Sequence, residues 1–176
     1  MRGVRFFFEN FWQTVRVRSG MLESLPEDPK QITDAQWKSL LSPVEYRILR
    51  HAGTEPPGTG RYLQDPDGPG MYVCAGCGNP LYPSTSKFHS GCGWPSFFEE
   101  IEPDALTIHR DTSHGMVRTE MRCARCDGHL GHIFDDAPQT PTGQRHCVNG
   151  FAVLFVPEGV DPQAALAAHR AEQNRG

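Results

Sequence analysis

The sequence predicts a mainly β, largely antiparallel domain that a metal site holds together and a helical arm precedes. Three observations predict it. From residue 71 onward the chain consists of short apolar or alternating stretches separated by turn residues. Before that point, two capping boxes mark the starts of two short helices. Four of the six cysteines form two Cys-x-x-Cys pairs, a spacing typical of metal knuckles.

Length and composition set the expected domain organisation. A chain of 176 residues with 22% charged side chains suits one globular domain with short extensions. We expect an N-terminal extension over 1–30, a domain over 31–160 that includes a helical arm over 33–52, and a short helix and tail over 161–176.

Charge and hydropathy exclude two classes of partner. The net charge is −4 and the chain has no long block of Lys or Arg, so nucleic acid is not an expected partner. No apolar run reaches the roughly 18 residues of a membrane-spanning helix, so no membrane association is expected. We expect a monomer.

The N-terminal segment 1–20 allows two interpretations. It carries four arginines, one acidic residue and an aromatic cluster, a composition that resembles an organellar targeting segment. Alternatively, translation starts at Met21 and the segment is not part of the protein. The cysteine usage favours a reducing compartment, and we expect the cytoplasm unless 1–20 is a targeting segment.

The helical arm is predicted from its boundaries. Residues 33–36 form a capping box that opens one helix, and residues 42–45 repeat the motif with Pro43 at the first helical position. Gly53 is expected to end the second helix. The stretch 54–70 is rich in Gly, Pro and Asp and should be an irregular loop.

Short strands follow. Residues 71–73, 106–108 and 116–122 have strand patterns, and the nearly all-apolar stretch 151–156 predicts a buried strand. Within 116–122 the alternation separates two faces, Val117, Thr119 and Met121 on one and Arg118, Glu120 and Arg122 on the other.

The two Cys-x-x-Cys pairs predict one structural Zn²⁺ per chain. Zinc favours four thiolates in a tetrahedron, and a closed set leaves no open position for catalysis. The expected ligands are Cys74, Cys77, Cys123 and Cys126. Two alternatives remain: His129 replaces one cysteine as a ligand, or the pairs are redox-active. The second is disfavoured because there are two copies and no βαβ pattern.

The segment 145–149 contains a candidate nucleophile. In an extended chain Arg145, Cys147 and Asn149 project to the same side. A neighbouring guanidinium favours the thiolate, and an amide can donate a hydrogen bond, so the surroundings suit a reactive Cys147. The alternative is an inert thiol in the core.

Two further clusters add candidate chemistry. Residues 129–136 contain two histidines and two aspartates, and Gly131 argues against a continuous helix there. Imidazoles near a thiolate can protonate a leaving oxygen, although histidines in a surface loop are the simpler reading of this cluster alone. The loop 92–97 carries Cys92 and Trp94, and a mobile loop suits a thiol that must meet another thiol.

Three segments carry a family resemblance. KFHSGCGWPSF (87–97), HGMVRTEMRCARCDGHLGHIFDD (114–136) and RHCVNG (145–150) closely resemble the B-type methionine-R-sulfoxide reductases, and the likeness runs from about residue 53 to 157. The resemblance implies two antiparallel sheets, with zinc away from the active site.

The resemblance also implies roles for individual residues. Cys147 would attack the sulfoxide sulfur and become a sulfenic acid, and Cys92 would resolve it as a Cys92–Cys147 disulfide. Thioredoxin would then reduce this disulfide, and oxidised proteins or peptides would be the substrates. Trp94 would pack on the methyl group of the substrate. Two further sets of side chains would bind and protonate the sulfoxide oxygen (His129, His132 and Asn149) and support the site (Asp136 and Arg145).

Some positions depart from the common family pattern: His89, His146 and the loop 65–70. They affect the expected substrate size preference and not the reaction. Two other functions compete with reduction. One is a zinc-ribbon-like binding module without catalysis, which would have no need of Cys92 or Cys147. The other is a metallohydrolase that uses His129 and His132 on a second metal.

Overall fold

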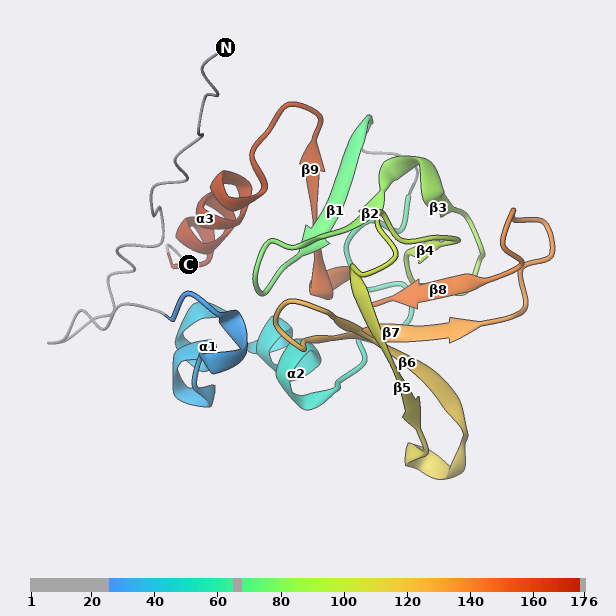
Figure 1. Ribbon diagram of the computed structural model, residues 1–176, viewed down its shortest axis with the longest axis horizontal. Coiled ribbons are helices and arrows are strands. Elements are labelled where there is room, and N and C mark those ends of the chain that lie inside the picture. Colours follow the sequence, from blue (N-terminus) through green and yellow to red (C-terminus); the bar gives the residue numbers. More distant parts are fainter. Residues whose placement is uncertain (1–25, 65–67, 175–176) are drawn as a thin grey trace, which may run out of the picture.

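Nine strands form two antiparallel sheets in the part of the chain that the structure describes, a computed structural model of residues 26–64 and 68–174 (Figure 1). One sheet has three strands in the order β2-β1-β9, and the other has six in the order β3-β4-β8-β7-β6-β5. The strands are β1 (Gly70–Cys74), β2 (Pro80–Pro83), β3 (Lys87–Phe88), β4 (Ser96–Phe97), β5 (Leu106–Asp111), β6 (Arg118–Cys123), β7 (His129–Phe134), β8 (Arg145–Val148) and β9 (Val153–Pro157). The predicted fold class is confirmed.

Both predicted helices of the arm are present as α1 (Asp34–Leu40) and α2 (Pro43–His51). Each begins with a complete capping box, in which the side chain at the cap and the one three residues later bond each other's backbone nitrogens. The end of α2 differs from the prediction. Ala52, not Gly53, adopts the left-handed conformation with φ of 48°, and the Gly53 nitrogen then bonds the Arg47 carbonyl.

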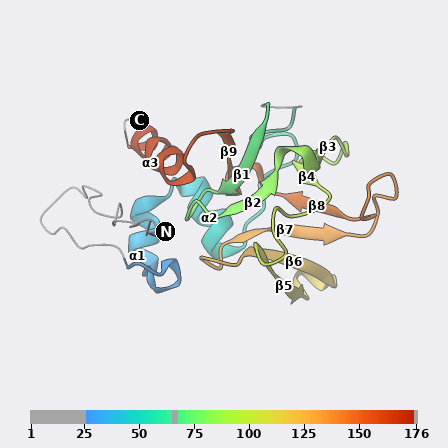
Figure 2. The same ribbon diagram turned by 45° about the horizontal axis from the view of Figure 1, so that its top comes forward.

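The helices lie together at one end of the molecule, beside the two sheets. Figures 1 and 2 show α1, α2 and the C-terminal helix α3 (Pro162–Gln173) on the same side. Trp37, Ile48 and Leu166 each bury their side chains in the same core as the sheet residues. Burial of such large apolar side chains contributes about 2 kcal/mol each, so the arm is part of the folded unit.

A buried carboxylate joins the helices. Glu45 is 1% exposed, and its side chain accepts hydrogen bonds from Arg61 and from Nε2 of His169, both at 2.7 Å. Burial alone would raise the pKa of Glu45, but the bonds from His169, Gln173 and Arg61 outweigh it and lower the pKa to about 2. The carboxylate therefore stays ionised and holds α3 against α2.

The last strand begins later than predicted. Residues 150–152 form a 3-10 turn, and β9 starts at Val153. The cause is Glu55, whose carboxylate accepts hydrogen bonds from the backbone nitrogens of Gly150 at 2.6 Å and Phe151 at 3.0 Å. These bonds satisfy the nitrogens without a neighbouring strand, so the chain turns before it enters the sheet.

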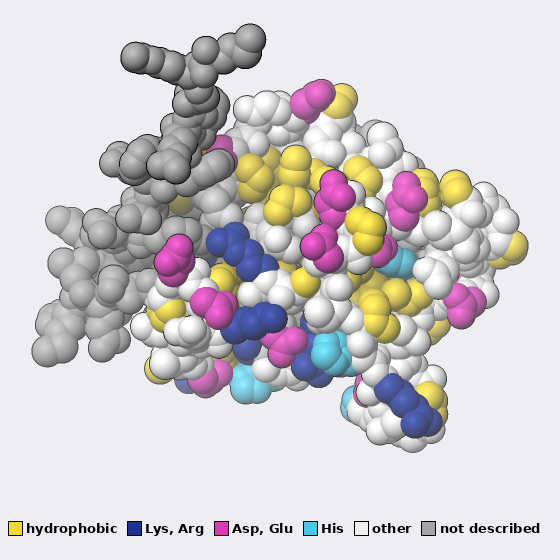
Figure 3. Space-filling view, in the orientation of Figure 1, with side chains coloured by type: hydrophobic (Ala, Val, Ile, Leu, Met, Phe, Trp, Pro, Cys, Tyr) yellow, Lys and Arg dark blue, Asp and Glu magenta, His cyan; other side chains and the backbone are white. Residues whose placement is uncertain are grey.

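The N-terminal targeting and start-site interpretations concern residues 1–20, which lie outside the described residues. Within the described ranges, no helix combines the length and the apolar character needed to cross a membrane. On the face seen in Figure 3, Lys and Arg side chains are interspersed with Asp and Glu.

Candidate active site

A row of polar residues crosses the six-stranded sheet. Cys147 on β8 pairs in register with Ser96 on β4 and with His132 on β7, and His132 pairs with Glu120 on β6. Residues directly opposite each other on neighbouring strands project from the same face. The register therefore places the Cys147 thiol, the His132 imidazole and the Glu120 carboxylate side by side. The sequence alone could not specify this arrangement.

A bulge brings the second histidine to this row. His129 and His132 are three residues apart on β7, and in a regular strand they would project from opposite faces. The pairing skips Leu130, because Met121 pairs with Gly131 but Arg122 pairs with His129. This extra residue reverses the alternation, and the two imidazole rings lie 5.4 Å apart.

Gly131 allows the strands to approach at this point. A Cβ atom at position 131 would overlap the carbonyl oxygen of Cys147 on the neighbouring strand. The glycine between the two histidines is therefore required by the close contact of β7 with β8, and it sits in a strand, as the argument against a helix implied.

The two candidate redox cysteines lie next to each other. Their Sγ atoms are 3.9 Å apart, and both side chains are half-buried. Cys92 is held by the loop before β4, where the Ser90 hydroxyl donates to Cys92 Sγ at 3.0 Å and lies 2.7 Å from the Ser96 hydroxyl. The sequence separates these cysteines by 55 residues, and the β4–β8 pairing brings them together.

Burial changes the expected acidity of Cys147. The sequence led us to expect that Arg145 would favour the thiolate. Arg145 does lower the pKa of Cys147, but burial and the negative charge of Cys92 outweigh it and raise the pKa to about 12. For Cys92, burial also raises the pKa, but hydrogen bonds from Ser90 and Ser96 lower it further, below its ordinary value. At neutral pH the resting Cys147 is a protonated thiol.

We therefore expect the Cys92→Ser substitution to lower the pKa of Cys147, because it removes the anion that opposes the second thiolate. The check is the pH dependence of Cys147 alkylation by iodoacetamide, followed by mass spectrometry, whose midpoint should move to lower pH. Arg145→Gln is the matched control and should move the midpoint the other way, since it removes the stabilising cation. An unchanged midpoint in both variants would contradict this account.

Arg145 and Asp136 form a bidentate ion pair. Nε of Arg145 donates to Asp136 Oδ1 at 2.9 Å, and a terminal nitrogen donates to Oδ2 at 2.8 Å. The guanidinium also lies over the Phe134 ring, 4.5 Å from its centroid. The two bonds of Asp136 thus fix the orientation of Arg145.

A cavity of about 110 Å³ opens in front of Cys147. It is lined by an apolar pair, Trp94 and Phe134, and by a polar set, Cys147, His132, Asn149 and Arg118. The combination suits a small group with an apolar end and a hydrogen-bonding oxygen. Arg118 is a residue that sequence reasoning did not assign to the site.

Asn149 and Trp94 are fixed by the backbone of Glu55. The Glu55 nitrogen donates to Asn149 Oδ1 at 3.0 Å, and the Trp94 indole nitrogen donates to the Glu55 carbonyl at 3.1 Å. Asn149 Nδ2 also donates to the Leu130 carbonyl. Glu55 lies in the loop that the sequence marked only as irregular, so no local signal pointed to this role.

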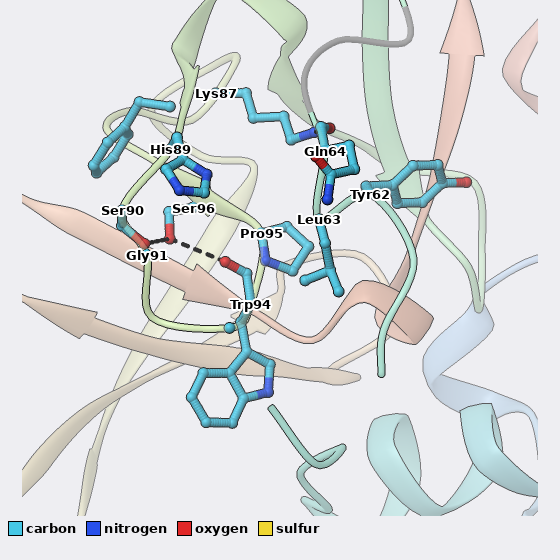
Figure 4. Close-up of a pocket in the computed structure, with 12 residues that line it drawn as sticks. Tyr62, Leu63, Gln64, Lys87, His89, Ser90, Gly91, Trp94, Pro95 and Ser96 are labelled. Carbon is cyan, nitrogen blue, oxygen red and sulfur yellow. Dashed lines mark hydrogen bonds between the residues drawn. The ribbon is translucent and has the colours of Figure 1, made fainter. Parts of the chain in front are cut away.

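A second hollow of about 270 Å³ (Figure 4) shares Trp94 with this cavity as a lining residue. It is formed by residues 62–64 and by the loop that carries Cys92, and His89 is among its lining residues. Figure 4 shows the Ser96 hydroxyl between Ser90 and the Trp94 carbonyl, which accepts at 3.3 Å. These hydrogen bonds give the loop that carries Cys92 a defined conformation at the edge of the hollow.

The four remaining cysteines form a buried cluster whose ligand atoms lie within 4.8 Å of one another. The Sγ atoms of Cys74 and Cys126 are 3.7 Å apart, and those of Cys77 and Cys123 are 3.6 Å apart. Zn–S bonds of about 2.3 Å in a tetrahedron require S–S separations near these values, so the donor set fits zinc. The first pair turns between β1 and β2 and the second between β6 and β7, so the cluster bridges the two sheets.

The histidines are not part of a metal cluster in the described residues. His129 Nδ1 lies 2.6 Å from Glu120 Oε1, and His132 Nε2 lies 2.8 Å from Asp111 Oδ2. The cysteine quartet is the one group of metal-binding side chains found in the described chain. These contacts argue against His129 as a zinc ligand and against the metallohydrolase reading. Asp111 and Glu120 are further residues that sequence reasoning missed.

The comparison with known proteins agrees with this geometry. Residues 41–157 match the family model described as the SelR domain. A "Peptide methionine sulfoxide reductase MsrB" from Agrobacterium fabrum is 54% identical over 125 residues, which cover 71% of this chain and 91% of the relative. The protein of that name from Thiobacillus denitrificans is 52% identical over 132 residues, 75% of this chain and 97% of the relative.

The match begins at residue 41, so it includes α2 as well as the β domain but not α1. Together with the paired cysteines on the sheet face, it identifies the chain as a member of the SelR-domain family, the B-type methionine sulfoxide reductases.

Proposed function

We propose that the chain reduces methionine-R-sulfoxide, mainly in proteins, through a Cys147 sulfenic acid and a Cys92–Cys147 disulfide that thioredoxin recycles. The observation that carries the proposal is the 3.9 Å separation of the two Sγ atoms beside an aromatic and imidazole-lined cavity. A disulfide needs a sulfur separation near 2 Å, so a small loop movement suffices to form it.

In the first step, Cys147 attacks the sulfoxide sulfur. The methyl group lies against Trp94, and the sulfoxide oxygen faces His132 and Asn149. A sulfoxide becomes a good electrophile only when its oxygen is protonated or hydrogen-bonded. The Cys147 proton passes to that oxygen through the imidazole, methionine leaves, and the oxygen remains on Cys147 as sulfenic acid. No external proton is needed, because the proton of the Cys147 thiol ends on the oxygen of the sulfenic acid.

In the second step, Cys92 attacks the sulfenic sulfur. The disulfide forms, and the oxygen leaves as water with the proton of Cys92. The lowered pKa of Cys92 favours its thiolate, which is the form that attacks the sulfenic sulfur. A dithiol reductant such as thioredoxin then supplies two electrons by disulfide exchange.

The cysteine cluster supports one structural Zn²⁺ per chain, held by Cys74, Cys77, Cys123 and Cys126. The ion would join the turn between β1 and β2 to the turn between β6 and β7. All four thiols are buried, and a closed thiolate set supplies cross-linking and no catalytic position. Each of the two sheets would thus be fixed relative to the other.

The size of the cavity supports a protein substrate. About 110 Å³ accommodates a thioether side chain, so the backbone of a substrate would stay at the rim, where a longer chain can continue. We further propose a monomer in the cytoplasm, where reduced thiols and thioredoxin coexist.

The test is turnover on separated epimers. The purified zinc-loaded protein is incubated with thioredoxin, its reductase and NADPH, and NADPH loss is followed on the R and S epimers of a blocked methionine sulfoxide. We expect turnover of the R epimer only. A folded protein that reduces neither epimer, with dithiothreitol also tried as reductant, would overturn the proposal and leave the zinc-ribbon-like binding module as the better description.

A further inference from the structure

Asp111 joins two side chains of the catalytic cavity without lining the cavity itself. Its Oδ2 accepts hydrogen bonds from Nε2 of His132 and from a terminal nitrogen of Arg118, both at 2.8 Å. His132 and Arg118 both line the cavity in front of Cys147. We propose that Asp111 is the positioning residue that holds His132 in its proton-donating orientation and fixes Arg118 at the cavity wall. This inference rests on the proposed reduction of the sulfoxide.

The carboxylate is itself held in place by its turn. Asp111 ends β5 directly opposite Arg118 on β6, and the Ser113 backbone nitrogen donates to Asp111 Oδ1 at 2.9 Å. The turn between the two strands is tight, with His114 in the left-handed region at φ of 54°. Both oxygens are therefore bonded, and the position of the carboxylate does not depend on a substrate.

The bond to Asp111 selects one tautomer of His132. A carboxylate only accepts, so Nε2 of His132 must carry a proton. Nδ1 of His132 has no protein partner among the described residues, and it is the nitrogen available to a substrate oxygen. In the protonated imidazole, Nδ1 also becomes a donor.

The other charged groups around His132 do not replace Asp111. Glu120 on β6 accepts from His129 and from Arg122, while His129 on β7 is buried. Cys147 on β8 is the reacting group, and Arg118 on β6 itself donates to Asp111. Hydrogen bonds from Ser113 and from His132 hold the pKa of Asp111 well below its usual range, so it remains an anion wherever the enzyme works.

The test compares Asp111→Asn with the matched control Asp104→Asn. Asp104 is exposed and does not line the cavity, so its substitution removes the same charge at a site away from the cavity. For Asp111→Asn we expect kcat/KM on the R epimer to fall by about tenfold to a hundredfold, mostly in kcat. Asp104→Asn should match the wild type.

Nitrogen-15 NMR of the wild-type histidines tests the geometry without any turnover. We expect His132 to carry its proton on Nε2 when neutral, and Asp111→Asn to lose this preference. A wild-type His132 protonated on Nδ1 overturns the inference even if the variant does not fold. So does a folded variant with an unchanged kcat. Absence of activity in the wild type would instead overturn the proposed function, because the NMR result does not depend on it.

Discussion

Replacing Cys147 with serine is expected to abolish methionine sulfoxide reduction, with a loss of more than about 10⁴-fold in kcat/KM. The serine hydroxyl occupies nearly the same volume in the half-buried site, but it is a far weaker nucleophile and cannot accept the oxygen as a sulfenic acid. The measurement is NADPH-coupled turnover on the R epimer, with circular dichroism and zinc content to show that the fold is intact.

Cys92→Ser is the matched control, because it removes the neighbouring thiol and keeps Cys147. It should produce one equivalent of methionine per enzyme in a single burst and accumulate a sulfenic acid that a cyclic dione traps on Cys147. Steady turnover with thioredoxin should be lost in this variant. A Cys147→Ser protein that still gives the burst, or a trapped sulfenic acid on Cys92, would show that the nucleophile has been misassigned.

The second large effect concerns the cysteine cluster. Cys123→Ser is expected to remove zinc and unfold the domain at room temperature. Structural zinc contributes about 10–16 kcal/mol of apparent binding free energy in small zinc domains, and a domain of this size has a net stability of only about 5–15 kcal/mol. Because the cluster bridges the two sheets, loss of one ligand frees the sheets from each other.

Thermal unfolding and metal analysis of the purified protein check this expectation. Cys92→Ser, which removes a thiol outside the cluster, should keep one zinc per chain and a wild-type melting temperature. A Cys123→Ser protein that melts as the wild type does would show that the core folds without the metal. It would also remove the structural role that we assign to the ion.

Several features were predictable because they depend on residues close together in the chain. The capping boxes of α1 and α2 need only side chains three residues apart, so the helices begin where the sequence placed them. Each Cys-x-x-Cys turn presents two thiolates by itself, so the donor set could be recognised before the turns met.

The end of α2 and the start of β9 were placed wrongly by one or two residues. At β9, a tertiary contact overrode the local preference. Glu55 bonds the nitrogens of Gly150 and Phe151 from 95 residues away and delays the strand. At the end of α2, the exposed Ala52 adopts the left-handed conformation, although glycine at the next position would fit it more easily.

The amino-acid sequence by itself determined which groups were candidates for the chemistry: two thiols outside the cysteine quartet, two imidazoles, an aromatic ring and an amide. The tertiary structure decided how they act. The extra residue Leu130 in β7 turns His129 to the face of His132, and strand pairing carries Asp111 to His132 across the sheet. Burial then raises the pKa of Cys147 against the effect of Arg145. Register, burial and long-range hydrogen bonds depend on strands that meet only in the folded chain, and local pattern therefore cannot specify them.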